Sequence, residues 1–248
     1  MEVHAHSHTP RKKWSHYFWE FLMLFLAVFC GFLAEYTLEH KIEKTREKQF
    51  IQSLMNDLKA DTANITLLNA FRLNVHERAD SLFDLMTSAS VDKNGFAIYY
   101  HGSSLSRRAF FYSADGTIQQ LKNSGGLRLI SNVQVADSIK AYDVLYRSIL
   151  QLQALEEEQL IKFRDVAAKV FDAAILLKFM RKDFNSLQDS VKLPNPKLKQ
   201  NDSNLLNELN ITIAYRMGNS YRILSDLEIL KEKATHLIEL MKKVYHLE

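Results

Sequence analysis

An apolar stretch at residues 17–38, YFWEFLMLFLAVFCGFLAEYTL, is the feature that most constrains how this chain folds. Its only acidic or basic residues are Glu20 near one end and Glu35 near the other. As a helix rising ~1.5 Å per residue, the stretch would be about 33 Å long, enough to cross a hydrocarbon core of ~30 Å. The sequence therefore predicts one transmembrane helix, followed by a large domain at residues 39–248.

A cleaved signal peptide is the main alternative to an anchor, because Arg11, Lys12 and Lys13 precede the apolar stretch. The stretch is longer than the ~7–15 apolar residues of a signal peptide, and Phe32 and Ala34 stand where a cleavage site needs two small residues. We therefore expect an uncleaved anchor. Basic residues beside its N-terminal end favour a cytoplasmic tail at residues 1–16. In a Gram-negative cell this arrangement is an inner-membrane protein with a periplasmic C-terminal domain.

The composition favours long helices. Seven glycines and three prolines among 248 residues are well below the usual shares of ~7% and ~5%, so helix breakers are scarce. We expect an all-α fold, in which the transmembrane helix continues into an elongated antiparallel helical bundle. Cys30, the only cysteine, lies in the apolar stretch, so the C-terminal domain forms no disulfide. The formal net charge of +3 is nearly balanced, and nucleic-acid binding is not expected.

Apolar residues at helical spacing predict three long amphipathic helices. The first extends from Glu35 to about Ser88, and the second from near Asn132 to about Arg181. The third covers residues 204–246, where coiled-coil spacing and charged flanks favour pairing with another helix, in the same chain or in a second copy. Within the second helix, we expect Glu156, Glu157 and Glu158 to form a solvated face.

Two connections separate these helices. Residues 89–114 contain scattered glycine and serine, and we expect a loop or a small hairpin. Residues 182–203 contain two prolines, and we expect a loop with nothing to hold it in one shape.

Residues 115–135 carry local signals for helix ends. Thr117 with Gln120, and Ser131 with Gln134, both fit the S/T-x-x-E/Q capping box of a helix start. The Gly125–Gly126 pair suits a helix end, where a left-handed residue is wanted. We expect a short helix at residues 118–124, apolar residues 127–130 in the core, and a new helix from near Asn132.

The candidate ligand or partner contacts lie around residues 107–112. Arginine offers planar charged donors, and aromatic rings beside it offer apolar contact, a combination typical of an anion site or a partner site. The simpler alternative is that the rings pack this segment onto the bundle and the arginines stay solvated. Arg128 is a further candidate contact, and the simpler alternative is that it lies on the surface without binding a ligand. The candidates are Arg107, Arg108, Phe110, Phe111, Tyr112 and Arg128.

Two other features, a carboxylate in the apolar stretch and histidines in the N-terminal tail, suggest proton transfer or helix pairing and metal binding, respectively. Glu20 lies inside the apolar stretch, where carboxylates usually carry protons or pair with another helix. It also lies one turn from an aromatic belt, so it can reach the headgroup region instead. In the tail, His4, His6 and His8 resemble a short metal-binding tract. We expect no physiological metal or cofactor, because nothing nearby would hold such ligands in place.

Two motifs resemble a known protein family. EFLMLFLAVFCGFLAE at residues 20–35 and QLKNSGGLRLI at residues 120–130 are similar to an uncharacterised group of single-span membrane proteins widespread in Bacteroidetes. The likeness in layout covers nearly the whole chain. The resemblance implies a Gram-negative inner-membrane setting and no particular chemistry.

Three functional hypotheses follow from the sequence. Residues 39–248 contain no nucleophile–base pair, phosphate-binding glycine loop or metal-ligand spacing, so an enzyme is not expected. The first hypothesis is a non-catalytic, membrane-anchored scaffold that assembles with itself or with an envelope membrane protein. The second is a periplasmic ligand-sensing bundle that acts through a partner. The third is a stator-like or channel accessory subunit that depends on Glu20.

Overall fold

A computed structural model describes residues 13–181, 187 and 194–247, and the structural statements below concern these residues. Their regular structure is entirely helical, which confirms the expected all-α class. The chain divides into two compact units, Met1–Gln49 and Phe50–Glu248. One uninterrupted helix, α1 (Trp14–Thr87), belongs to both units.

The first unit contains the apolar part of α1. Its most apolar window has a mean hydropathy of 2.0, and none of that window is buried within the protein. By length and composition, this helix can cross a membrane. The helix begins at Trp14, so residues 14–16 are helical although the sequence assigns them to the tail. The candidate metal ligands His4, His6 and His8 lie outside the described residues.

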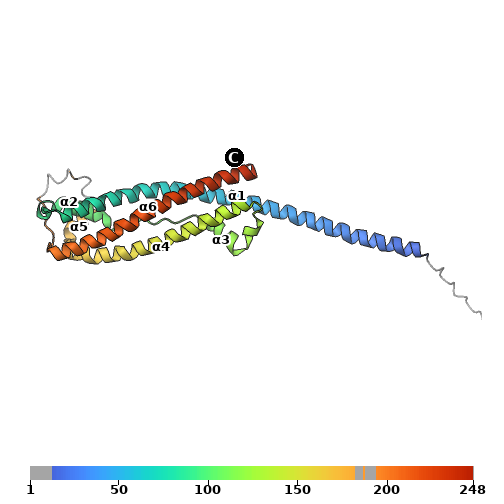
Figure 1. Cartoon of the computed structure of the whole chain (residues 1–248), viewed down its shortest axis with the longest axis horizontal. Helices are drawn as coiled ribbons and strands as arrows, with labels where there is room; N and C mark the ends of the chain where they lie inside the picture. The colour runs from blue at the N-terminus through green and yellow to red at the C-terminus, as the bar shows by residue number, and fades with distance from the viewer. Residues whose placement is uncertain (1–12, 182–186, 188–193, 248) are drawn as a thin grey trace, which may run out of the picture. The chain divides into compact units, whose positions relative to one another are not determined.

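The second unit is a bundle built on residues 50–87 of α1 together with α4 (Val133–Val170) and α6 (Ser203–Tyr245). Figure 1 shows α4 and α6 side by side along the bundle. The apolar faces form two separate buried clusters. The first includes Ile51, Leu58, Ile139, Tyr142, Leu230 and Leu237, and the second includes Leu82, Phe163, Val170, Leu209 and Ile213.

The membership of these clusters gives the direction of each helix. The first cluster combines residues 51–65 of α1 and early residues of α4 with late residues of α6, and the second combines residues 79–86 of α1 and late residues of α4 with early residues of α6. Helices α1 and α4 therefore run in the same direction, and α6 runs antiparallel to both.

An irregular segment at residues 107–115 makes this arrangement possible by returning the chain along the bundle. The side chain of Gln153 in α4 accepts from the Phe111 backbone N–H at 2.6 Å and donates to the Phe111 carbonyl at 3.2 Å. The Ser113 N–H donates to the Tyr146 hydroxyl at 3.3 Å. The segment thus runs antiparallel to α4 before α3 (Gly116–Asn123) begins.

The expectation of a loop or small hairpin at residues 89–114 is wrong for its first part, where a short 3-10 helix η1 (Val91–Lys93) and the helix α2 (Gly95–Leu105) lie. The glycines of α2 permit close packing and do not break the helix. A Cβ added at Gly95 would lie 1.7 Å from the Pro196 carbonyl oxygen, and one at Gly102 would lie 2.7 Å from the Phe171 ring.

The helix ends near residues 115–135 follow the sequence in part. Gly125 is left-handed, with φ of 66°, as the glycine pair predicts. Thr117 forms no capping box. Its backbone N–H donates instead to the Asp57 carboxylate of α1 at 3.2 Å. The cap of α4 is Asn132, whose side-chain oxygen accepts from the Val135 N–H at 3.0 Å, so the cap lies one residue after the predicted Ser131.

Residues 126–130 complete this connection. A 3-10 helix, η2 (Gly126–Leu129), follows Gly125. Leu127 packs against the first apolar cluster, and Ile130 is buried in it. The expectation that residues 127–130 contribute to the core is therefore confirmed for these two residues.

The second long helix is shorter than predicted. It ends at Val170, and Asp172 begins a separate helix, α5 (Ala173–Met180), by accepting from the N–H groups of Ala174 and Ile175. An aspartate that caps a new helix start is a local signal that the unbroken apolar stripe hides.

The loop before α6 has fixed contacts at residues 194–202. Asn195 accepts from the Phe96 N–H at 3.1 Å and donates to the Asp92 carbonyl at 2.8 Å. The Lys199 N–H donates to the Val170 carbonyl at 2.9 Å. The expectation that nothing holds this loop is wrong for this part, and residues 182–186 and 188–193 lie outside the described residues.

Candidate functional site

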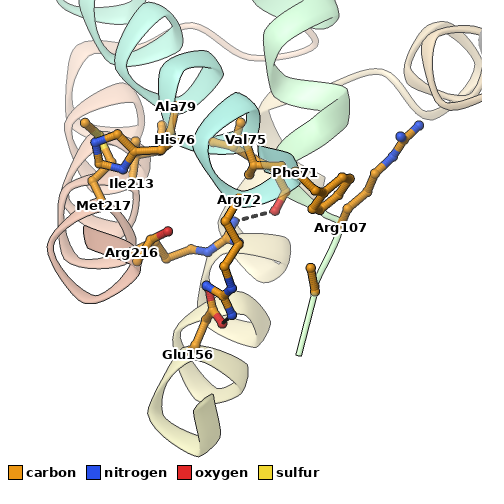
Figure 2. Close-up of a pocket in the computed structure, with 13 residues that line it drawn as sticks. Phe71, Arg72, Val75, His76, Ala79, Arg107, Glu156, Ile213, Arg216 and Met217 are labelled. Carbon is orange, nitrogen blue, oxygen red and sulfur yellow. Dashed lines mark hydrogen bonds and ion pairs between the residues drawn. The ribbon is translucent and has the colours of Figure 1, made fainter. Parts of the chain in front are cut away.

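A layer of charged residues separates the two apolar clusters midway along the bundle. Each long helix contributes one buried charged side chain to it: Arg72 from α1, Glu156 from α4 and Arg216 from α6. We call these three residues the arginine layer. Figure 2 shows the three side chains extending from different helices into one region of the pocket. The expected solvated face at Glu156 is therefore wrong, because this residue is buried.

Arg72 and Glu156 form a buried bidentate ion pair. Arg72 Nη1 donates to Glu156 Oε1 at 3.1 Å, and Nη2 donates to Oε2 at 2.7 Å. The Arg72 side chain is only 3% exposed. Its Nε lies buried without a hydrogen-bond partner among the described residues. One arginine thus uses both oxygens of Glu156, and the Nε–H of that arginine stays without an acceptor among the described residues.

Arg216 has no carboxylate within ion-pair distance in the part of the chain that the structure describes. Its Nη1 donates to the Leu105 carbonyl, and its guanidinium carbon lies 5.2 Å from the Phe163 ring centroid. The residue is 8% exposed, and its Nε has no partner among the described residues. Burial lowers the pKa of Arg216 well below its usual value, to about 10, although the Glu156 charge acts in the opposite direction.

The arginine layer therefore holds two buried guanidinium groups and one buried carboxylate, an excess of one positive charge. The cost of burying an ion falls only when a partner charge and full hydrogen bonding compensate it. A pocket of about 30 Å³ borders the layer, and it is lined by His76, whose buried Nδ1 also has no hydrogen-bond partner within the described part of the chain. Such a site is suited to binding a small anion.

The structure brings one predicted candidate to this pocket. Arg107 is among the lining residues, but in Figure 2 its side chain points away from Arg72 and Arg216. Arg108 pairs with Glu157 at 2.9 Å and lies over the Phe110 ring, with the guanidinium carbon 5.5 Å from the ring centroid. Arg108 and Phe110 therefore contact each other outside the arginine layer.

The remaining candidates lie elsewhere. Phe111 is fully buried and packs edge-on against Tyr146, with ring centroids 5.8 Å apart, so it holds its segment on the bundle. Tyr112 is 70% exposed. Arg128 is exposed in η2 and does not line the pocket. Glu20 is exposed on the apolar part of α1.

A second buried polar group contrasts with the arginine layer. Asp61 of α1 accepts from the Tyr142 hydroxyl at 2.5 Å, from the Ala114 N–H at 2.7 Å and from the Ser113 hydroxyl. We call these four residues the Asp61 cluster. Burial, together with the neighbouring Asp61 carboxylate, raises the pKa of the Tyr142 hydroxyl. This cluster ties the returning segment to α1 and α4, and its carboxylate is well supplied with donors.

The sequence analysis did not identify the arginine layer, although a signal for it exists. Glu156 lies four residues from both Leu152 and Leu160, and Arg216 follows Ile213 by three residues. Helical spacing assigns these positions to the buried stripe, yet they carry charged residues. Charged residues at such positions therefore indicate the arginine layer from the sequence. Leu155 and Tyr221 also fit the apolar spacing of these helices, but both are exposed.

Among the described residues, no group of three or more His, Cys, Asp or Glu side chains is placed to hold a metal ion. Comparison of the chain with protein-family models, with curated proteins and with solved structures found no match.

Proposed function

We propose that this protein is a membrane-anchored, non-catalytic interaction protein whose helical bundle binds a partner in the cell envelope. The observation that carries the proposal is α1 itself. Its first part is apolar, long enough to cross a membrane and unburied, and the same helix supplies one of the three long helices of the bundle. A helix shared in this way tethers a binding domain to a membrane.

The setting of the proposal comes from the sequence. Arg11, Lys12 and Lys13 beside the apolar stretch support a cytoplasmic tail and a periplasmic bundle. The resemblance of residues 20–35 and 120–130 to a Bacteroidetes family supports a Gram-negative inner membrane. The partner is a second copy of the chain or another membrane protein of the envelope.

The partner contact does not use the apolar stripe of α6. That stripe packs inside the bundle, where Leu209, Leu227 and Leu237 are fully buried. Tyr112, by contrast, is an exposed ring on the returning segment, with its centroid 6.5 Å from that of Phe110, the ring that Arg108 covers. Exposed aromatic residues beside arginine are favoured contacts in protein interfaces. We assign the contact to the surface around Tyr112.

Photo-crosslinking in living cells tests this assignment. The photoreactive residue p-benzoylphenylalanine replaces Tyr112, and in a matched control it replaces Tyr215 of α6, which is 68% exposed. We expect a crosslinked product from Tyr112 alone, with the partner identified by mass spectrometry. Equal products from both positions would reject this surface. Absence of any product, together with a monomeric mass in detergent, would reject the proposed function.

A ligand-sensing bundle is the second candidate, and the pocket beside the arginine layer favours it. In this function, a small ligand would bind between α1, α4 and α6. Ligand binding would then alter the contact between the tethered bundle and its partner. The crosslink yield at Tyr112 would then depend on the ligand.

A further inference from the structure

We infer that the pocket bordering the arginine layer is a binding site for a small monocarboxylate, whose carboxylate group lies against the guanidinium groups of Arg72 and Arg216. The inference deepens the second candidate function by naming the class of ligand. It does not depend on the membrane anchor or on a protein partner, so it can fail while the proposed tethering function stands.

The charge balance of the layer requires an anion. Arg72 and Arg216 are both more than nine-tenths buried, and among the described residues Glu156 is the only carboxylate paired with either. An uncompensated buried charge is strongly unfavourable, because the protein interior solvates it far less well than water does. One negative charge restores neutrality, whereas a divalent ion such as phosphate would leave an excess of the opposite sign.

The unused donors indicate an acceptor with two oxygens. Arg72 and Arg216 each retain a buried Nε–H without a partner among the described residues. A carboxylate presents two oxygen atoms in one plane, so it can accept from both guanidinium groups, and such charge-assisted bonds are about twice as strong as neutral ones. The buried Nδ1 of His76 is a further polar atom at the wall.

The rest of the pocket favours a short apolar tail. Phe71, Val75, Ile213 and Met217 line it, together with Ala79 and Leu105. Its volume of about 30 Å³ corresponds to about two or three water molecules. This size fits acetate or propionate and excludes a large or branched acid. A chloride ion would neutralise the charge but leave the apolar part of the pocket without a contact.

Thermal unfolding of the full-length protein in a non-ionic detergent tests the inference. Circular dichroism follows unfolding in a Bis-Tris gluconate buffer at constant ionic strength, because gluconate is a carboxylate too large for the pocket. Sodium propionate should raise the melting temperature with the logarithm of its concentration above Kd, by about 5 °C or more at a hundredfold excess over Kd. Propionamide, which has the same shape without the charge, should have no effect.

Three variants assign the effect to the layer. Arg216→Gln should abolish the propionate response, whereas Arg128→Gln, which removes an exposed arginine outside the pocket, should keep it. Glu156→Gln removes the carboxylate that competes for Arg72, and should therefore lower the Kd for propionate about tenfold. A residue with a merely structural role would not give this opposite pair of effects.

Several outcomes would overturn the inference. These are the absence of any rise in the melting temperature of the wild-type protein with propionate, the same Kd in Arg216→Gln, and a response to sodium chloride equal to that of propionate. If Arg216→Gln does not fold, the result from Glu156→Gln decides, and an unchanged or raised Kd in that variant overturns the assignment.

Discussion

Two buried polar groups in the same bundle differ in how completely their hydrogen bonds are made. The Asp61 carboxylate is 2% exposed and receives three hydrogen bonds from Tyr142, Ser113 and Ala114. The arginine layer is buried to a similar degree, yet two guanidinium nitrogens in it have no partner among the described residues. The Asp61 carboxylate thus has its hydrogen-bond donors within the chain, whereas the arginine layer keeps N–H donors that have no acceptor among the described residues.

This difference separates a structural role from a binding role. A fully bonded buried group fixes neighbouring segments, and here the Asp61 cluster holds residues 113 and 114 against α1 and α4. A buried group with unused donors loses stability unless something outside the chain completes it. The comparison therefore predicts opposite responses when each group is removed.

Removal of the Asp61 carboxylate should have the largest effect. Asp61→Ala leaves the Tyr142 hydroxyl, the Ser113 hydroxyl and the Ala114 N–H without their acceptor. We expect the free energy of unfolding to fall by about 4 kcal/mol, since each buried unpaired group costs roughly 1–3 kcal/mol. Urea unfolding of the full-length protein in detergent, followed by circular dichroism, measures this change.

The matched control for Asp61 is an aspartate with an exposed partner. Asp137→Ala removes an ion pair with Lys140 in which both side chains are more than half exposed. Its effect should stay below about 0.5 kcal/mol. If Asp61→Ala costs no more than this control, or if propionate restores its stability, the two buried groups do not differ as we describe.

Tyr142→Phe tests the same cluster one bond at a time. The change removes only the hydroxyl that donates to Asp61 at 2.5 Å, and the ring keeps its place in the first apolar cluster. Two donors then remain on the carboxylate. We expect a loss of about 1.5 kcal/mol, the usual contribution of a hydrogen bond to a charged group. In the same urea titration, a loss as large as that of Asp61→Ala would show that the cluster depends on this bond alone.

Much of the fold was predictable because the long helices follow an apolar pattern. The expected ends near Ser88 and Asn132 lie within about one residue of the observed Thr87 and Val133. The helix α2 was not predicted, because its glycines serve close approach to Pro196 and Phe171, which are distant in sequence. No local pattern distinguishes a glycine that breaks a helix from one that lets another segment pack against it.

The candidate site was predictable only in small part. The aromatic and arginine residues at positions 107–112 were predicted as contacts because they are adjacent in sequence. Of these residues, only Arg107 lines the pocket. Arg72, Glu156 and Arg216 come from three helices whose alignment depends on the returning segment. Their charges on buried stripes were visible in the sequence, but their proximity follows from tertiary packing alone.

Arg216→Met should have the smallest effect, with the opposite sign. Burial lowers the pKa of Arg216 to about 10, a shift from its usual value that corresponds to roughly 3 kcal/mol of destabilisation by the charged form. Methionine removes this charge and keeps an apolar contact with Phe163, but it leaves the Leu105 carbonyl without its donor, at about 2 kcal/mol. Without added anion, we expect a net gain of about 1 kcal/mol at neutral pH.

The pH dependence of this gain distinguishes charge from packing. Because the pKa of Arg216 is lower in the folded state, its charge destabilises the wild-type protein fully below about pH 10, and this penalty is lost progressively as the pH rises above about 10. The advantage of Arg216→Met should therefore shrink by about 1 kcal/mol between pH 9 and pH 11. Arg128→Met, at an exposed arginine, should match the wild type throughout. A destabilised Arg216→Met whose deficit does not change with pH would mean that Arg216 contributes through packing and that its charge is already compensated.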